Sequence, residues 1–166
     1  MAGFGPVTGV VLSLDMDEVR WLSEVESFAW RNFVQAYHLL ERQLEQQLQR
    51  DAGISHAQWN VLVVLSLAPD HRMRMTELAR KVVVSKSSLT YQIGKLESAG
   101  LVRRERHETD ERGIVAVLTP EGAELQASLA PGHVQTVRTY LIDLFTEEQL
   151  GALGEWMRIV KEKADT

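Results

Sequence analysis

The spacing of apolar residues predicts a long helix in the first third of the chain. Its apolar positions recur every three or four residues, which places them on one face of an α-helix. They are Phe33, Tyr37, Leu40, Leu44 and Leu48, with Trp30 and Val34 widening the stripe. Ser23 and Glu26 have the spacing of a capping box, so the helix is expected to run from there to about Gln49. A helix this long exceeds what a small core can cover, and we expect its apolar face to reach a partner subunit.

Three shorter signals in the middle of the chain predict a helix-turn-helix. Ser55 is followed three residues later by Gln, a second capping box, and the helix that it opens is expected to run to about Leu67. Thr76 and Ser85 are expected to open two further helices, and Gly100 ends the second of them. The apolar residues that this last helix directs inward are Leu89, Ile93 and Leu96. Two short helices joined by a tight link, the second with a polar first turn, are typical of a helix-turn-helix.

After Gly100 the hydrophobic period changes to two. Residues 101–106 and 113–118 alternate as strands do, and residues 107–112 are expected to form the turn between them. The sequence therefore predicts a two-stranded ribbon directly after the helix-turn-helix.

Two helices are predicted after the ribbon. Thr119 and Pro120 are typical of a helix start, because proline fits the first helical turn. This helix is expected to kink or break briefly near Pro131 and to resume afterwards. Its apolar positions after the proline are Val134, Val137, Leu141 and Leu144. A Thr-x-x-Gln capping box at Thr146 opens the terminal helix.

The order of these elements predicts a mainly α fold with a minor β component. We expect a winged helix-turn-helix with a two-stranded wing, flanked by N- and C-terminal helices that form a dimerisation region. The dimerisation region is assigned to residues 17–54 and 119–166, and the winged lobe to residues 55–118. Residues 1–16 are expected to form a weakly ordered arm, because glycine and proline interrupt any regular pattern there.

Composition narrows the class of protein. The chain of 166 residues has no cysteine, which excludes disulfides, cysteine-based zinc sites and thiol nucleophiles. It has no apolar run near the roughly 18 residues of a membrane helix, so no membrane partner is expected. The first residues lack the positive stretch of a signal peptide. A cytoplasmic protein is therefore expected.

Basic charge is concentrated in one segment of an acidic chain. The net charge is −5, but residues 71–118 carry ten Lys and Arg against six Asp and Glu, a balance of +4. A local basic patch can attract phosphate even when the total charge is negative. The alternative is a solvated surface on which basic residues cluster by chance.

Two motifs, at residues 75–102 and 110–122, together with the order of the helices around them, resemble the MarR family of bacterial transcriptional regulators. The first is MTELARKVVVSKSSLTYQIGKLESAGLV in the helix-turn-helix, and the second is DERGIVAVLTPEG, with the D-x-R and L-T-x-E-G patterns of the wing. The similarity extends over roughly residues 21–163. It implies a homodimer that binds pseudo-palindromic double-stranded operator DNA. It also implies a ligand-responsive repressor that loses affinity when a small molecule binds.

The candidate DNA contacts lie on the second helix of the helix-turn-helix and on the wing. The major groove accepts one helix, whose first turns must offer small polar side chains to bases and phosphates. The residues that fit are Ser85, Lys86, Ser87, Ser88, Thr90, Tyr91 and Gln92. On the strands, Arg103, Arg104 and Arg106 can bind phosphates, and alternation puts only some of them on the DNA face. The resemblance implies that Arg112 enters the minor groove and that Asp110 orients its guanidinium.

Three residues are candidates for an effector site. Trp30, His38 and Trp59 are expected to line a cleft between the first two helices and the winged lobe. Their aromatic walls and one polar group suit a small aromatic or phenolic molecule. In the alternative interpretation, the tryptophans belong to the core.

Two other classes of function are less well supported. The five histidines fall on different predicted elements without metal-ligand spacing, so no catalytic residue, metal site or cofactor is predicted. A winged helix can also mediate protein contacts, which the acidic total charge would permit. The basic wing tip and the polar turn at Ser85 favour DNA over a protein partner.

Overall fold

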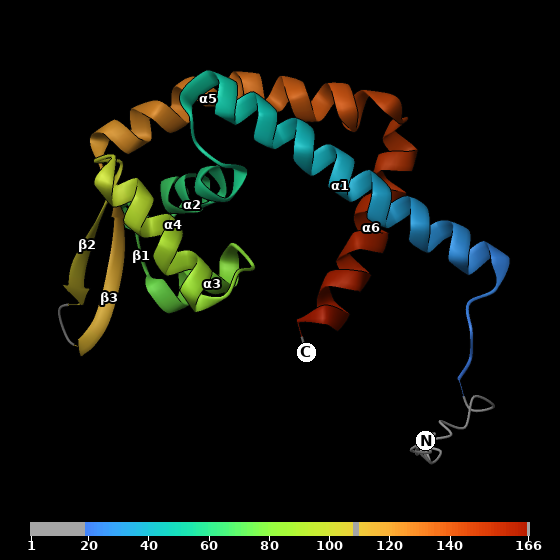
Figure 1. Cartoon of the computed structure of the whole chain (residues 1–166), viewed down its shortest axis with the longest axis horizontal. Coiled ribbons are helices and arrows are strands. Elements are labelled where there is room, and N and C mark those ends of the chain that lie inside the picture. The colour runs from blue at the N-terminus through green and yellow to red at the C-terminus, as the bar shows by residue number, and fades with distance from the viewer. Residues whose placement is uncertain (1–18, 108–109, 166) are drawn as a thin grey trace, which may run out of the picture. The chain divides into compact units, whose positions relative to one another are not determined.

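The computed structural model describes residues 19–107 and 110–165, without the side chains of residues 111 and 112. The predicted arm, residues 1–16, lies outside the described residues. The chain divides into two units within the first helix, after Ala36. The elements in chain order (Figure 1) are α1 (Glu24–Ala52), α2 (His56–Ser66), η2 (Pro69–His71), β1 (Arg72–Arg74), α3 (Met75–Lys81), α4 (Lys86–Ser98), β2 (Val102–His107), β3 (Asp110–Leu118), α5 (Pro120–Tyr140), η3 (Ile142–Leu144) and α6 (Glu147–Ala164).

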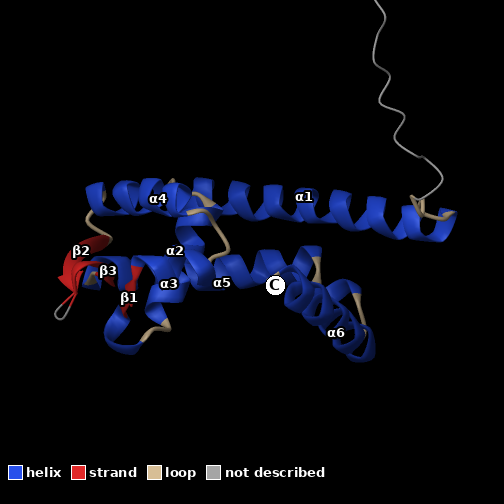
Figure 2. Cartoon of the chain, turned by 90° about the horizontal axis from the view of Figure 1, so that it is seen from below, coloured by secondary structure: helices blue, strands red, loops and turns tan. Residues whose placement is uncertain are grey.

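The second unit contains the winged helix-turn-helix and the two long helices that follow it. Figures 1 and 2 show α3, α4 and the strands gathered at one end of α5, with α6 at its other end. This arrangement confirms the mainly α fold with a helix-turn-helix and a wing. The division into a winged lobe and a dimerisation region stays a prediction.

The wing belongs to a three-stranded antiparallel sheet with the order β1-β3-β2. β2 and β3 are the predicted ribbon, paired from Val102 opposite Leu118 to His107 opposite Asp110. β3 begins at Asp110, so the predicted turn was too wide. The short strand β1 was not predicted, because its sequence Arg-Met-Arg has too few residues to show a period of two.

Local caps set most of the helix starts. Ser23 and Glu26 exchange their backbone and side-chain hydrogen bonds, which confirms the first capping box. Complete capping boxes also form at Ser55 and Thr146, and the Ser85 side chain accepts a hydrogen bond from a backbone N–H. The prediction that Thr76 caps a helix is wrong: the N-cap is Arg74, which is also the last residue of β1 and pairs with Val115, so α3 begins at Met75, directly after the sheet.

The helix after the wing differs from its prediction in two ways. α5 continues through Pro131 without the short break, and the alternative of a kink there stays a prediction. A proline removes one backbone hydrogen bond, and the buried Leu129 beside it keeps the helix packed on the core. α5 then ends at Tyr140, so Leu141 and Leu144 lie beyond it, in the cap and in η3.

The core lies in the second unit and draws on every element around the helix-turn-helix. Its largest fully buried side chains are Leu48, Leu62, Leu65, Leu78, Leu89, Ile93, Leu96, Val61 and Val102. The end of α1 contributes Leu48, and α5 contributes Leu129. The core of the winged lobe therefore includes side chains from both helices that flank it in sequence.

Candidate DNA-binding interface

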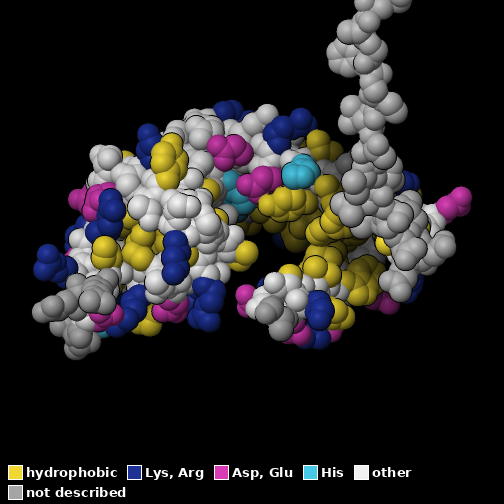
Figure 3. Space-filling view, turned by 60° about the horizontal axis from the view of Figure 1, so that its bottom comes forward, with side chains coloured by type: hydrophobic (Ala, Val, Ile, Leu, Met, Phe, Trp, Pro, Cys, Tyr) yellow, Lys and Arg dark blue, Asp and Glu magenta, His cyan; other side chains and the backbone are white. Residues whose placement is uncertain are grey.

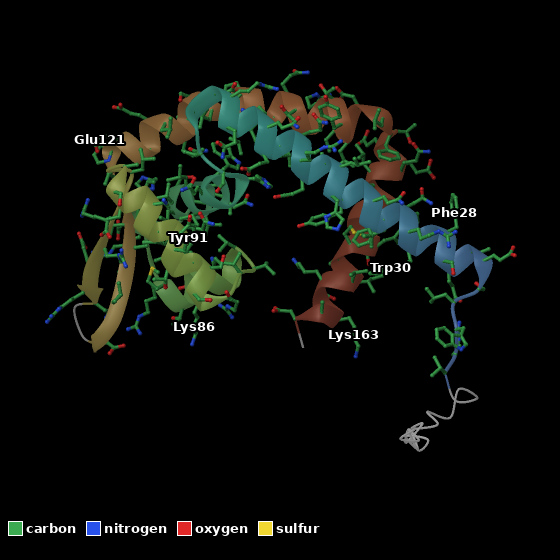
Figure 4. All side chains as sticks on the ribbon, viewed as in Figure 1. Phe28, Trp30, Lys86, Tyr91, Glu121 and Lys163 are labelled. Atoms are coloured by element: carbon green, nitrogen blue, oxygen red, sulfur yellow. The ribbon has the colours of Figure 1, made fainter. Side chains whose placement is uncertain are left out.

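The exposed face of α4 consists of polar side chains near its N-terminus. Lys86, Ser87, Thr90 and Tyr91 are exposed, and Tyr91 has 62% of its surface accessible. Figure 4 shows Lys86 at the N-terminal end of α4 and Tyr91 further along the same helix. Ser85 is also exposed, and its hydroxyl accepts a hydrogen bond from the backbone N–H of Ser88 at 3.2 Å. This face has the polar character that a helix needs in the major groove.

The opposite face of α4 anchors the helix in the core. Leu89, Ile93 and Leu96 are almost completely buried, as predicted. Gln92 was predicted to face DNA, but it is half-buried and lines a cavity that Tyr37 also lines. Its position on the inner side of the helix follows from its spacing, three residues after Leu89. The structure thus separates Gln92 from the exposed face.

Lys95 is a cation on the exposed face that was not among the predicted contacts. Its Nζ lies 5.6 Å from the centre of the Tyr91 ring, within the range of a cation–π interaction. The signal in the sequence was its position, four residues after Tyr91 and therefore on the same face of the helix. A DNA backbone that approaches Tyr91 would also approach this charge.

The arginines of β2 divide between the two faces of the wing. Arg104 lines a cavity of about 310 Å³ together with Thr90 of α4 and Ile114 of β3. Alternation puts Arg106, which is exposed and pairs with Ile114, on this same face. Arg103 lies on the other face, where its Nε donates to Glu105 at 2.7 Å. The structure therefore brings two of the three predicted arginines to the side of the wing nearest α4.

Arg104 is already engaged by a carboxylate of α4. Its Nε and Nη2 donate to Glu97 Oε2 at 2.8 and 2.5 Å, and its backbone N–H donates to Oε1 at 3.0 Å. These hydrogen bonds from Arg104 lower the pKa of the Glu97 carboxyl. The Glu97 carboxyl is therefore ionised at neutral pH.

Near the wing tip, Asp110 has a partner that the sequence did not indicate. Its Oδ2 accepts a hydrogen bond from Arg74 Nη1 at 3.2 Å, and Arg74 Nη2 lies 3.2 Å from His107 Nδ1. Gly113 is required beside them, because a Cβ there would lie 2.8 Å from the Cβ of His107. The side chain of Arg112 lies outside the described residues, so its orientation by Asp110 stays a prediction.

The Leu-Thr-Pro-Glu-Gly motif joins the wing to α5. The Thr119 hydroxyl donates to the Gly100 carbonyl at 2.7 Å and accepts a hydrogen bond from the Gly122 backbone N–H at 3.0 Å. A Cβ on Gly122 would lie only 2.1 Å from the carbonyl oxygen of Leu101. The motif thus packs the first turn of α5 against the link between α4 and β2.

The predicted effector residues have different surroundings. Trp59 is only 4% exposed and belongs to the core, where its ring centre lies 4.9 Å from that of His133. His38 is exposed on α1 beside Tyr37, and Trp30 is exposed in the first unit. The core position of Trp59 agrees with the alternative interpretation of that tryptophan.

A small cavity with a mixed lining lies between α1, α2 and α4. It has a volume of about 280 Å³, and residues 82–84 form part of its wall. Its apolar walls include Val61 and Leu89, and Asn60 and Gln92 supply amide groups. A cavity of this kind can hold a small molecule by apolar contact and a few hydrogen bonds.

A half-buried histidine pair lies near the start of α2. The rings of His56 and His133 are stacked with their centres 5.7 Å apart, and His56 Nδ1 lies 2.9 Å from both carboxylate oxygens of Glu41. Burial, and secondly the charge of His56, lower the pKa of His133. His133 Nδ1 is buried and has no hydrogen-bond partner among the described residues.

The described part of the chain offers neither a metal cluster nor a membrane span. Within it, no group of three or more His, Asp and Glu side chains could hold a metal ion. Among the same residues, no helix is both long and apolar enough to cross a membrane.

Comparison with known proteins identifies the family. The sequence model of a protein family, the MarR family, matches residues 52–113. The transcriptional repressor YetL of Bacillus subtilis strain 168 is 32% identical over 116 residues, which cover 66% of this chain and 70% of YetL.

Two solved structures of Streptomyces coelicolor regulators are also similar. Sco3205, solved in complex with DNA, is 47% identical with a TM-score of 0.86 over 89% of this chain and 92% of that one. AbsC is 42% identical, with a TM-score of 0.84 over 88% of this chain and 98% of AbsC. The chain belongs to the MarR family of transcriptional regulators.

Proposed function

We propose that this regulator is a ligand-responsive repressor that binds pseudo-palindromic operator DNA as a homodimer. In this proposal α4 occupies the major groove through Lys86, Ser87, Thr90 and Tyr91. The wing lies over the adjacent minor groove, with Arg112 at its tip. Repression requires only that the bound dimer exclude the transcription machinery from its site.

The observation that carries the proposal is the exposed polar face of α4 beside a wing whose strands carry four arginines. Lys86, Lys95 and Arg106 are exposed cations of the same lobe. Figure 3 shows several Lys and Arg side chains on the lobe formed by the helix-turn-helix and the wing. The similarity to Sco3205, solved with DNA bound, supports the same use of these elements here.

Exposed apolar side chains support the homodimer. In the first unit Trp21, Val25 and Phe28 have 67, 78 and 65% of their surface exposed. On α6, Trp156 and Ile159 are 61 and 54% exposed. A folded monomer rarely leaves so many large apolar side chains in water, and a second copy of the chain would cover them symmetrically.

The effector is expected to bind the cavity between α1, α2 and α4. Its volume of about 280 Å³ suits a single aromatic ring, and its polar groups could fix a phenolic hydroxyl. Gln92 and Leu89 belong both to this wall and to α4. A ligand there would therefore act directly on the helix that we place in the major groove.

We infer that the chain acts without catalysis and in the cytoplasm, where bacterial operator DNA lies. The relatives named above are transcriptional regulators. No cofactor is needed for the binding reaction.

The proposal is tested by selecting bound fragments from a genomic library and titrating the best fragment at several salt concentrations. We expect a dissociation constant of about 10⁻⁸ M or lower at physiological salt and an affinity that falls steeply as salt rises. Binding that does not depend on salt, or no enrichment of any fragment, would contradict the proposal. A small phenolic compound that releases the fragment would support the effector site.

A further inference from the structure

Glu97 and Arg104 connect the recognition helix to the wing. Glu97 lies in the last turn of α4, and Arg104 is the third residue of β2. Three hydrogen bonds join them across the bend at Gly100, which has a left-handed φ of 74°. Both oxygens of the carboxylate are used, one by the guanidinium and one by the backbone of the strand. The contact therefore constrains the strand itself as well as a side chain.

The guanidinium of Arg104 lies against α4. A Cβ placed on Gly94 would be 3.9 Å from Arg104 Nη2, so the side chain passes over the helix surface at that glycine. The side chains of Arg104 and Glu97 keep 34 and 37% of their surface exposed. An ion pair this exposed contributes little to stability, because water competes for both charges. The pair can instead act by holding the start of β2 in a fixed position against α4.

A carboxylate at this place opposes DNA binding by simple electrostatics. Glu97 is ionised, since Arg104 lowers its pKa, and it lies on the lobe that we place against phosphates. The negative charge would be unfavourable there unless it served another purpose. The pair offers one, because a recognition helix and a wing must reach two different grooves at the same time.

We propose that Glu97 and Arg104 are a positioning pair that fixes the wing relative to α4, and that Arg104 is not a phosphate ligand. This inference rests on the proposed DNA binding and revises the expectation that Arg104 contacts the backbone. Without the pair, β2 and β3 would sample several orientations, and DNA would have to select one of them. The cost would appear as weaker binding with an unchanged number of phosphate contacts.

The two roles of Arg104 predict opposite signs for Glu97→Gln. If Arg104 were a phosphate ligand, the substitution would free it and remove a negative charge, so binding would tighten. If the pair positions the wing, the substitution weakens binding. The slope of log affinity against log salt stays the same in that case, because this slope reports phosphate contacts.

The experiment measures the affinity of the full-length protein for a selected genomic fragment by fluorescence anisotropy at several salt concentrations. The variants are Glu97→Gln, Arg104→Gln and the double variant. Glu105→Gln is the matched control, because it also removes one carboxylate charge, but from β2, the strand of Arg104, on the face away from α4, where Glu105 pairs with Arg103 and Arg72. We expect Glu97→Gln and Arg104→Gln each to weaken binding by about three- to tenfold, and the double variant to be no weaker than either. The control is expected to leave binding unchanged or slightly tighter.

Amide hydrogen exchange of residues 102–107 in the free protein supplies a readout that does not need DNA. We expect faster exchange there in Glu97→Gln and no change in Glu105→Gln. Tighter binding by Glu97→Gln, or a lower salt slope in Arg104→Gln with additive effects in the double variant, would overturn the positioning role. Unchanged exchange in Glu97→Gln would also overturn it. Failure of the parent protein to bind any selected fragment would instead contradict the proposed function.

Discussion

Val83 holds a left-handed backbone conformation in the turn of the helix-turn-helix. Its φ is 55°, and 86% of its surface is exposed. A β-branched side chain is strained in this conformation, whereas glycine is not. We predict that Val83→Gly raises the free energy of unfolding by about 0.5–1 kcal/mol, measured by urea denaturation. Val82→Gly is the control, because Val82 has a φ of −86°, and there the free energy of unfolding should fall. A loss of stability in both variants would show that Val83 is not strained.

Gly122 is required for a different reason, the close approach of two backbone segments. A Cβ at this position would lie 2.1 Å from the carbonyl oxygen of Leu101, a backbone atom that cannot move alone. We predict that Gly122→Ala lowers the free energy of unfolding by at least about 2 kcal/mol. Gly151→Ala in α6 is the control, since no atom lies within 4 Å of its added Cβ. There the better helix propensity of alanine should raise stability slightly, and equal losses in both variants would contradict the account.

His133 should make stability depend on pH. Its pKa in the folded state is lowered by burial and by the charge of His56, so the unfolded chain binds a proton at a higher pH than the folded one. As pH falls below about 6.5, the unfolded state takes up this proton first and stability is lost. His133→Leu should therefore flatten the fall in melting temperature between pH 7 and 5. The same change at the exposed His38 should not, and an unaltered pH profile in His133→Leu would contradict the assignment.

At the scale of elements, the wing tip carries a prediction about charge and its sign. Arg112→Ala should weaken operator binding by about 1–3 kcal/mol and lower the salt slope by about one per subunit contact, with little change in melting temperature. Asp110→Ala should also weaken binding, although it removes a negative charge, because Asp110 is expected to orient Arg112. Anisotropy titrations at several salt concentrations measure both effects. Tighter binding by Asp110→Ala would contradict the orienting role of Asp110, and Arg112 would then act only as one more positive charge.

The sequence predicted those elements that neighbouring residues determine. The caps at Ser55, Ser85 and Thr146 lie within three residues of their partners, and the helices start where these caps indicate. The polar face of α4 could also be predicted from neighbouring residues, because it lies opposite the buried residues Leu89, Ile93 and Leu96 of the same helix. β1 could not be predicted, because its pairing depends on β3, some 40 residues away.

Side-chain partners distant in sequence were the part of the site that could not be predicted. Arg74 and Asp110 are 36 residues apart, and their contact exists only once β1 joins the sheet. The cavity that Gln92 lines is shared with Tyr37, 55 residues earlier in the chain, and no local pattern indicates that the two residues lie together. The contact between Glu97 and Arg104 spans seven residues, but it requires the bend at Gly100.

At the scale of the whole molecule, the proposed homodimer would join the winged lobe to the exposed apolar surfaces of α1 and α6. The core of the lobe includes Leu48 of α1 and Leu129 of α5, so α1, which carries exposed apolar residues, is also built into the lobe. In the proposed homodimer, we expect a change in how two copies pack to reach the helix-turn-helix through α1. For the effector proposed to bind between α1, α2 and α4, this continuity would provide a physical route to the proposed DNA contacts.

The central claim is that two copies of this chain read DNA symmetrically through α4 and the wing. Hydroxyl-radical footprinting of the selected genomic fragment tests it most directly. The account predicts two protected patches related by a two-fold axis, with half-site centres about 10 bp apart or a near multiple of that spacing. A single asymmetric patch, or no protection at protein concentrations that shift the fragment, would contradict it.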